Sequence, residues 1–150
     1  MVTSSDSEVQ VLMPCKPEQA TRSVSLRVHL KDVSTQIHMQ ACEAGNMNFA
    51  LAELTVPPNG STQELRDAWR LASLASLQAT ELQTVSEPRL IKGGKPSQAL
   101  MTRVTTHAHQ TQFIWFITKQ TIYQAAVYAQ ANDKGFAEAA ETYTSGIKWP

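Results

Sequence analysis

The most constraining feature of this sequence is an apolar stretch over residues 111–129 that a short polar segment divides in two. Its first half contains five consecutive bulky residues, 113–117 (Phe-Ile-Trp-Phe-Ile), which are β-branched or aromatic and too few for the core of a helix. An uninterrupted run of this kind is typical of a strand that is covered on both faces, near the middle of a sheet. The second half, residues 122–129, has apolar side chains on both alternating faces. We therefore predict a central antiparallel hairpin that turns within residues 118–121.

Apolar and polar side chains alternate in the first third of the chain, as in strands with one face in water. This alternation predicts four strands, at residues 9–13, 23–30, 35–42 and 47–56. Pro14 and Pro17 end the first strand, because proline cannot donate a hydrogen bond to a neighbouring strand. Residues 43–46 (Glu-Ala-Gly-Asn) tolerate positive φ and predict a hairpin turn between the last two strands.

A capping box at residues 61–64 (Ser-Thr-Gln-Glu) predicts a helix that runs to about residue 82. A helical wheel places an alanine-rich stripe on the face turned to the sheet: Leu65, Ala68, Trp69, Ala72, Ala75, Ala79 and Leu82. Leu74 and Leu77 fall on the charged side, where a solitary helix would not need them. These two leucines predict a second contact, either with the N-terminal segment of this chain or with a partner, such as another protein or a second copy in a dimer.

The rest of the chain continues with strands and a final helix. Residues 83–91 form an edge strand, because Pro88 interrupts them, and residues 98–106 form a longer strand. Asn132-Asp133 caps the final helix, in which Gly146 is placed as a C-terminal glycine. The apolar stripe of this helix is Phe136, Ala139, Ala140 and Tyr143. The order predicts an α+β fold, an antiparallel sheet of about six to eight strands flanked by two main helices.

The totals indicate one globular domain, which we assign to residues 9–150, after a disordered linker at residues 1–8. Thirteen basic residues balance thirteen acidic ones, so no overall field favours nucleic acid or an anionic membrane as partner. No apolar run is long enough for a membrane span, and the N-terminus lacks a signal peptide. Either the protein is cytoplasmic or a leader has been removed. The polar residues 3–8 favour the second interpretation, hence a periplasmic or extracellular location.

Cys15 and Cys42 are the only cysteines, and they are too few for a zinc site. They form either a disulfide or two buried thiols. Cys42 continues the polar positions of its strand, whereas Cys15 continues the apolar positions Val9, Val11 and Met13, an argument against pairing unless Pro14 resets the register. We favour the disulfide.

Few residues suggest chemistry. His107 and His109 stand two apart and would share a strand face, but no third ligand lies nearby in sequence, so no metal or cofactor is predicted. Residues 92–95 (Lys-Gly-Gly-Lys) lead into a strand and not into a helix, so a hairpin turn is preferred to a phosphate site. The sequence has no nucleophile elbow and no spaced pair of carboxylates, and we expect a protein that is not an enzyme.

Large aromatic residues could serve either of two purposes. Trp69, Trp115, Tyr123 and Phe136 are either plain core or the lining of a pocket between the helices and the sheet. The second interpretation would make the protein a carrier of a small apolar ligand.

Five segments of this chain resemble the PsbP-like family, whose small bacterial relatives have unknown functions. The segments are residues 11–17 (VLMPCKP), 49–57 (FALAELTVP), 93–101 (GGKPSQALM), 121–129 (TIYQAAVYA) and 136–149 (FAEAAETYTSGIKW). Met13 and Tyr143 stand where the family usually has phenylalanine. The resemblance implies an α/β/α sandwich and, given members as different as photosystem subunits, a Ran-binding protein and exported bacterial proteins, a module for protein interaction or assembly. No binding residues of the family can be assigned to this chain.

Overall fold

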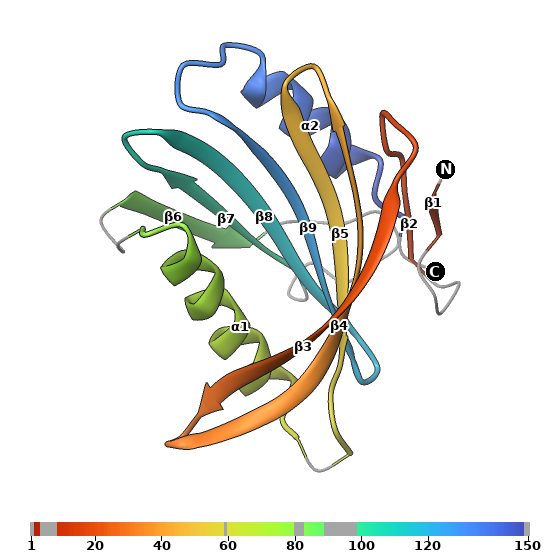
Figure 1. Ribbon diagram of the computed structural model, residues 1–150, viewed down its shortest axis with the longest axis vertical. Coiled ribbons are helices and arrows are strands. Elements are labelled where there is room, and N and C mark those ends of the chain that lie inside the picture. The colour runs from red at the N-terminus through yellow and green to blue at the C-terminus, as the bar shows by residue number, and fades with distance from the viewer. Residues whose placement is uncertain (1, 4–8, 59, 80–82, 89–98, 149–150) are drawn as a thin grey trace.

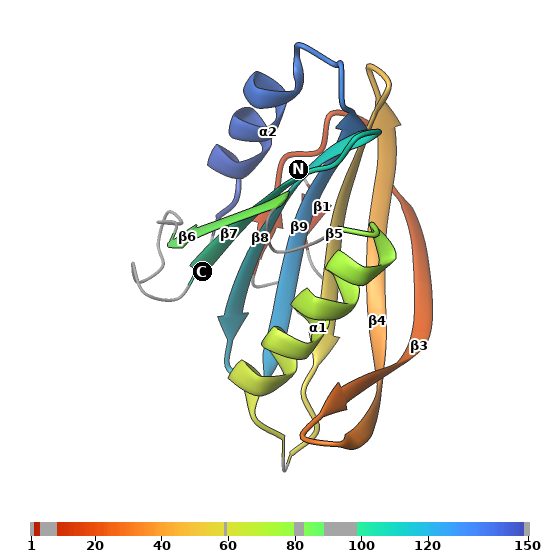
Figure 2. The same cartoon turned by 90° about the vertical axis from the view of Figure 1, so that its left-hand side faces the viewer.

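The structure is a computed structural model that describes residues 2–3, 9–58, 60–79, 83–88 and 99–148. It contains a seven-stranded antiparallel sheet with one helix on each face, and a separate two-stranded sheet near the N-terminus (Figures 1 and 2). Each helix covers only part of its face. The predicted α+β fold with an antiparallel sheet is confirmed.

The main sheet has the strand order β3-β4-β5-β9-β8-β7-β6. Its strands are β3 (Glu18–Val28), β4 (Lys31–Ala44), β5 (Met47–Thr55), β6 (Thr84–Pro88), β7 (Ala99–Thr105), β8 (His109–Thr118) and β9 (Thr121–Gln130). The β8–β9 hairpin lies within the sheet as predicted, because β9 pairs with β5 and β8 pairs with β7. The side chains of Phe113, Ile114, Trp115 and Phe116 are all buried, on alternating faces. The apolar run is therefore explained by cover on both sides of the sheet.

Two-residue turns with positive φ close the long hairpins. Gly45 and Asn46 form the predicted turn, with φ of 59° and 65°. His29 and Leu30 form a second turn, with φ of 48° and 68°, although neither residue is typical of this conformation. Because this turn takes only two residues, β3 ends at Val28, before the predicted end at residue 30, and β4 begins at Lys31, before the predicted start at residue 35. The two strands pair along eleven residue pairs, since β3 also begins earlier than the predicted residue 23.

The strand predicted at residues 9–13 does not join the main sheet. Only β2 (Gln10–Val11) is a strand there, and it pairs with β1 (Val2–Thr3), within the segment expected to be a linker. Gln10 also forms an antiparallel bridge to Lys148 near the other end of the chain. Val9 and Val11 are buried under this arrangement, so the segment covers the sheet and does not extend it.

Helix α1 (Thr62–Ser76) begins as predicted, because the Ser61 hydroxyl accepts a hydrogen bond of 3.3 Å from the Glu64 amide. It ends earlier than residue 82, because Gln78 has a φ of 56° and leaves the helical conformation. The predicted sheet-facing stripe is wrong at Ala72 and Ala75, which are exposed, whereas Ala79 packs against the core cluster and Leu82 lies outside the described residues. The sheet curls around α1, as Figure 1 shows, and the buried residues of the helix are Leu65, Trp69 and Leu74.

Helix α2 (Phe136–Ser145) packs on the opposite face of the sheet from α1. Phe136, Ala140 and Tyr143 are buried as predicted. Asp133 lies before the cap residue Gly135 and accepts a hydrogen bond of 2.9 Å from the Gly135 amide. Gly146 has an ordinary φ of −82°, so it is not the left-handed glycine that we expected. Its missing Cβ instead makes room for Leu12, whose Cβ would lie 3.3 Å from an added Cβ.

Two buried glutamines connect the sheet to the helices. Gln112 accepts a hydrogen bond of 2.6 Å from Arg103 and donates one of 2.8 Å to Thr144 of α2. Gln124 donates a hydrogen bond of 3.1 Å to Ser73 of α1. A strand side chain on each face is thus matched to a hydroxyl group of the helix that covers that face.

We expect Gln112→Leu to lower the free energy of unfolding by about 1–3 kcal/mol, because the half-buried Arg103 guanidinium and the buried Thr144 hydroxyl would lose their partner. Urea unfolding followed by circular dichroism would measure the loss. Gln36→Leu makes the same replacement at an exposed strand position and should change stability by less than about 0.5 kcal/mol. Equal losses in the two variants would contradict the role of Gln112.

Candidate functional site

The four aromatic residues predicted to line a ligand pocket do not share one. Trp69 and Trp115 pack edge to face on the α1 side of the sheet, with ring centroids 5.3 Å apart. Tyr123 and Phe136 belong to the cluster on the α2 side, where Tyr123 stacks on Phe116. All four predicted pocket residues are buried, so the sheet separates two packed halves of the core. The pocket prediction at these residues is wrong.

Leu74 is covered by this chain, and Leu77 is partly covered. Leu74 is only 4% exposed and belongs to the same cluster as Trp69, and Leu77 is half-buried against that cluster. Leu77 lies one residue past the end of α1, on the side that the curled sheet encloses. The interpretation of these leucines as a partner surface is therefore wrong for Leu74, whose side chain has little accessible area. The exposed leucine of α1 is Leu71.

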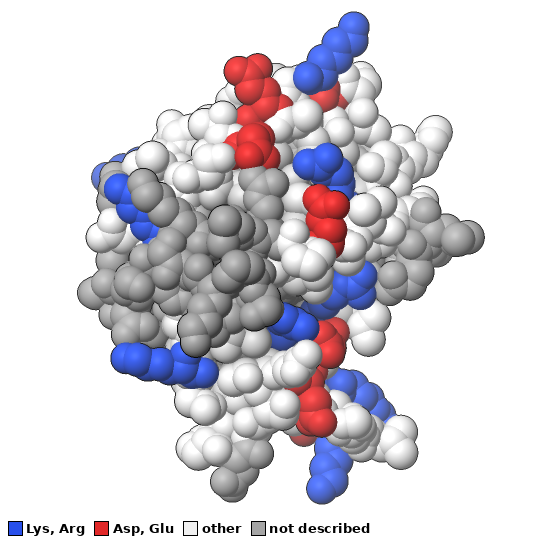
Figure 3. Space-filling view, turned by 180° about the vertical axis from the view of Figure 1, so that it is seen from behind, with Lys and Arg blue, Asp and Glu red and all other residues white. Residues whose placement is uncertain are grey.

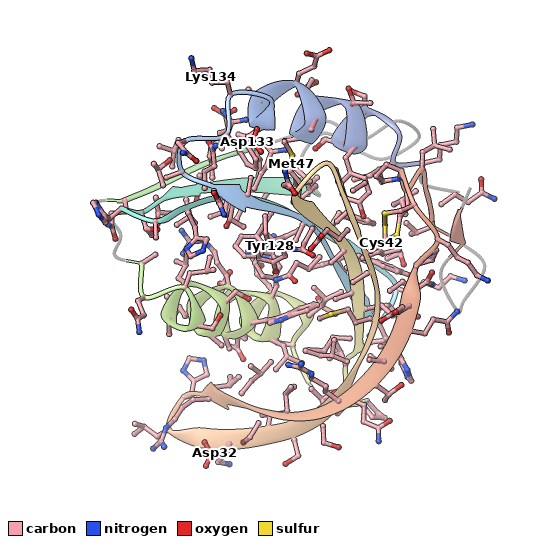
Figure 4. The ribbon with its side chains drawn as sticks, turned by 45° about the horizontal axis from the view of Figure 1, so that its top comes forward. Asp32, Cys42, Met47, Tyr128, Asp133 and Lys134 are labelled. Atoms are coloured by element: carbon pink, nitrogen blue, oxygen red, sulfur yellow. A yellow bond between two sulfur atoms is a disulfide. The ribbon has the colours of Figure 1, made fainter. Side chains whose placement is uncertain are left out.

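A disulfide joins Cys15 to Cys42 of β4. Figure 4 shows it as a yellow bond on the side of the sheet where the N-terminal segment lies. The bond is possible despite the opposite strand parities because Cys15 lies beyond Pro14, outside β2. It attaches the N-terminal segment to the main sheet.

An apolar groove lies next to this disulfide, between the N-terminal segment and α2. It has a volume of about 490 Å³ and opens to solvent. Its described lining residues are Leu12, Met13, Pro14, Phe49, Gly135, Glu138, Ala139, Thr142 and Tyr143. We call this set the apolar groove. Its size falls within the range of binding sites for small molecules.

Contacts within the chain hold the floor and one wall of the apolar groove. Phe49 and Tyr143 form its floor, packed edge to face at 5.4 Å. The Tyr143 hydroxyl donates a hydrogen bond of 2.8 Å to the Ala50 carbonyl. One wall, the segment from Gln10 to Cys15, is fixed at both ends, by backbone hydrogen bonds of 3.1 and 2.8 Å between Gln10 and Lys148 and by the disulfide. A groove with fixed walls requires little ordering when a ligand binds.

Electrostatics of the groove are simple. Among the described lining residues of the apolar groove, Glu138 is the charged one, and its side chain is exposed at the rim. Burial raises the pKa of Tyr143, with a smaller contribution from the negative charge of Tyr128, so its hydroxyl stays protonated and keeps its hydrogen bond. Elsewhere, acidic and basic side chains alternate over the face in Figure 3 and form no large patch of one sign.

The two neighbouring histidines lie in a second hollow, which we call the polar cleft. It has a volume of about 670 Å³ and is lined by Asn48, Ser76, Leu77, Gln78, Gln83, Thr106, His107, Ala108, His109, Thr111 and Tyr128. Most of these residues can form hydrogen bonds. The ionisable groups among them are the two histidines and the Tyr128 phenol. Burial raises the pKa of Tyr128 to about 12. Within the part of the chain that the structure describes, no three His, Cys, Asp or Glu side chains are grouped to hold a metal ion.

Other candidates have ordinary local contacts. His29 lies 2.9 Å from a Glu64 carboxylate oxygen, and His38 lies 2.9 Å from the Thr21 hydroxyl. The glycine turn predicted at residues 92–95 lies outside the described residues.

Sequence reasoning missed the apolar groove, although Leu12 carried a signal. It is apolar at the position that the alternation of Val9 and Val11 assigns to solvent, and it is 50% exposed.

Comparison of the sequence with models of known protein families and with curated proteins gives no match. Of the helices in the described residues, neither is long and apolar enough to cross a membrane.

Removal of the disulfide in Cys15→Ala/Cys42→Ala should lower the free energy of unfolding by about 3–4 kcal/mol, because the bond closes a loop with a sequence separation of 27. The wall of the groove should also loosen. Hydrogen exchange under native conditions should show a larger increase at the Val11 amide than at the Phe113 amide. Unchanged exchange at Val11 would contradict the role of the disulfide in fixing this wall. Reduction of the wild-type disulfide is the matching control.

Stability should fall at alkaline pH, because the buried Tyr143 and the largely buried Tyr128 hold their protons more tightly in the folded chain than in the unfolded chain, where the pKa is near 10. The stabilisation is complete below about pH 10 and declines as the pH rises toward the folded value of about 12 for Tyr128. Urea unfolding at several pH values would measure this slope. We expect a shallower slope in Tyr143→Phe than in the Gln36→Leu control, and equal slopes would contradict the assignment.

Proposed function

We propose that this chain is a non-enzymatic binding module whose apolar groove takes an apolar segment of a partner protein. The observation that carries this proposal is the apolar groove itself, an open and rigid concavity beside a disulfide. Leu12 and Met13 expose apolar surface along its wall, and methionine adapts well to different apolar partners.

The shape of the groove favours a protein segment over a carried small molecule. A carrier encloses most of the surface of its ligand, whereas this groove is open to solvent. Glu138 at the rim favours a partner segment with a lysine or arginine next to its apolar residues. The partner is therefore a polypeptide with a short apolar stretch and a basic neighbour.

Membership of the PsbP-like family and an exported location belong to the same proposal. Two helices on opposite faces of an antiparallel sheet are in keeping with an α/β/α sandwich, and a module of that family would serve interaction or assembly. The disulfide supports a periplasmic or extracellular location, because disulfides persist in oxidising compartments.

A carrier of a small apolar ligand is the second candidate. It rests on the volume and apolar lining of the groove, about 490 Å³, since the pocket expected around the tryptophans is filled. Native mass spectrometry of the isolated protein would separate the two candidates. A bound small molecule that Leu12→Asp removes would favour the carrier.

A photo-crosslinking residue at position 12 tests the protein-binding proposal, with position 71 as the control. Leu71 is 58% exposed, close to the 50% of Leu12, but lies on α1 at the other face of the sheet. We expect the residue at position 12 to capture a protein through an apolar segment that carries a basic residue. Similar crosslinking from both positions would contradict the proposal.

The captured segment, made as a peptide, gives a quantitative test. Leu12→Asp should weaken its binding by about tenfold or more, because a charge would enter the apolar contact, whereas Leu71→Asp should leave the affinity unchanged. Isothermal titration calorimetry measures both affinities. Equal affinities would show that the segment binds elsewhere.

A further inference from the structure

The two edges of the main sheet are built differently. Strand β6 is short, with five residues, and ends in Pro88, two features that discourage further pairing. Strand β3 has eleven residues and no proline, and it is the last strand in the sheet order. No segment that the structure describes pairs with its outer edge, which Figures 1 and 2 show at the margin of the sheet.

The hairpin register determines which backbone groups point outward from β3. Val28 and Lys31 are the pair that closes the two-residue turn, so they exchange hydrogen bonds with each other. Hydrogen-bonding direction alternates along a strand, and the register continues to Glu18 without a bulge. The N–H and C=O groups that point away from β4 therefore belong to Gln19, Thr21, Ser23, Ser25 and Arg27.

This outward set is symmetric about Ser23, which is also the midpoint of β3. If a second β3 lies antiparallel across a two-fold axis at Ser23, every outward residue meets another outward residue. The facing pairs are Ser23 with Ser23, Thr21 with Ser25, and Gln19 with Arg27. Like charges do not face each other, and the Thr21–Ser25 pair can share a hydroxyl hydrogen bond.

We infer that β3 is a self-association edge, through which two copies of this chain join their sheets antiparallel with Ser23 on the two-fold axis. The partner is a second copy, because in this register every outward residue of β3 meets an outward residue of the other copy and no two like charges stand directly opposite each other. A two-fold interface of this kind uses the same surface on both copies. It is independent of the apolar groove, which lies between α2 and the N-terminal segment.

A single cysteine tests the register directly. Hydrogen-bonded antiparallel pairs have Cα atoms about 5.5 Å apart, within the range for a disulfide, so Ser23→Cys should crosslink to itself. Ser25→Cys is the matched control, because two copies of residue 25 would lie about 13 Å apart along the strands. Non-reducing electrophoresis after mild oxidation should show a dimer for Ser23→Cys alone. An equal mixture of Thr21→Cys and Ser25→Cys should also crosslink.

Crosslinking of Ser25→Cys to itself as strong as that of Ser23→Cys, or no crosslinking of Ser23→Cys, would overturn the inference.

A second measurement uses no added cysteine. Ser23→Pro removes an outward N–H and leaves the inward bonds to β4, so the fold should persist. Its dimer dissociation constant should rise by about tenfold or more, whereas Ser23→Ala should match wild type. Sedimentation that shows only monomeric wild-type protein would likewise overturn the inference.

Discussion

The fold depends on one requirement: both faces of the β8–β9 hairpin must be removed from water. Phe113 and Trp115 point to one face and Ile114 and Phe116 to the other, and all are buried. A single helix covers only one face, so the chain must supply two separate covers. Helix α1 is one, inside the curl of the sheet, and α2 with the N-terminal segment is the other (Figure 2). The hairpin therefore determines where every other element has to lie.

Apolar burial alone would let the helices slide over the sheet, and the buried polar side chains oppose this. Gln112 and Gln124 each lie on the hairpin and bond to a hydroxyl group of the helix on their own face. A shift of either helix would leave a buried amide group without its partner, which costs more than a small loss of apolar contact. The two glutamines thus select one position for each helix, which the apolar contacts alone do not specify.

The sequence predicts those features that local residues determine. The apolar run at residues 113–117 and the cap at Ser61 are of this kind. Features that depend on long-range packing are harder to predict from the sequence. For example, the curl of the sheet determines that Leu74 is buried and that Ala72 is exposed. His29 and Gln78 adopt positive φ although neither is a glycine, so the sequence does not indicate the turn between β3 and β4 or the end of α1. The separation of Trp115 from Tyr123 can be predicted from the sequence. A two-residue turn at residues 119–120 pairs Trp115 with Gln124 and puts Tyr123 on the opposite face of the sheet.

The apolar groove follows from a mismatch of lengths. Helix α2 has ten residues and is about 15 Å long, whereas β9, also ten residues, extends over about 33 Å. The helix therefore leaves part of its face bare, and the N-terminal segment covers the remainder with Val9 and Val11. The N-terminal segment and α2 come from opposite ends of the chain and do not pack against each other as closely as the turns of one continuous helix. A seam therefore remains between these two elements, and the apolar groove lies in this seam. The disulfide and the Gln10–Lys148 bridge keep this seam at a fixed width, because the disulfide joins the N-terminal segment to β4 and the bridge joins it to the residues that follow α2.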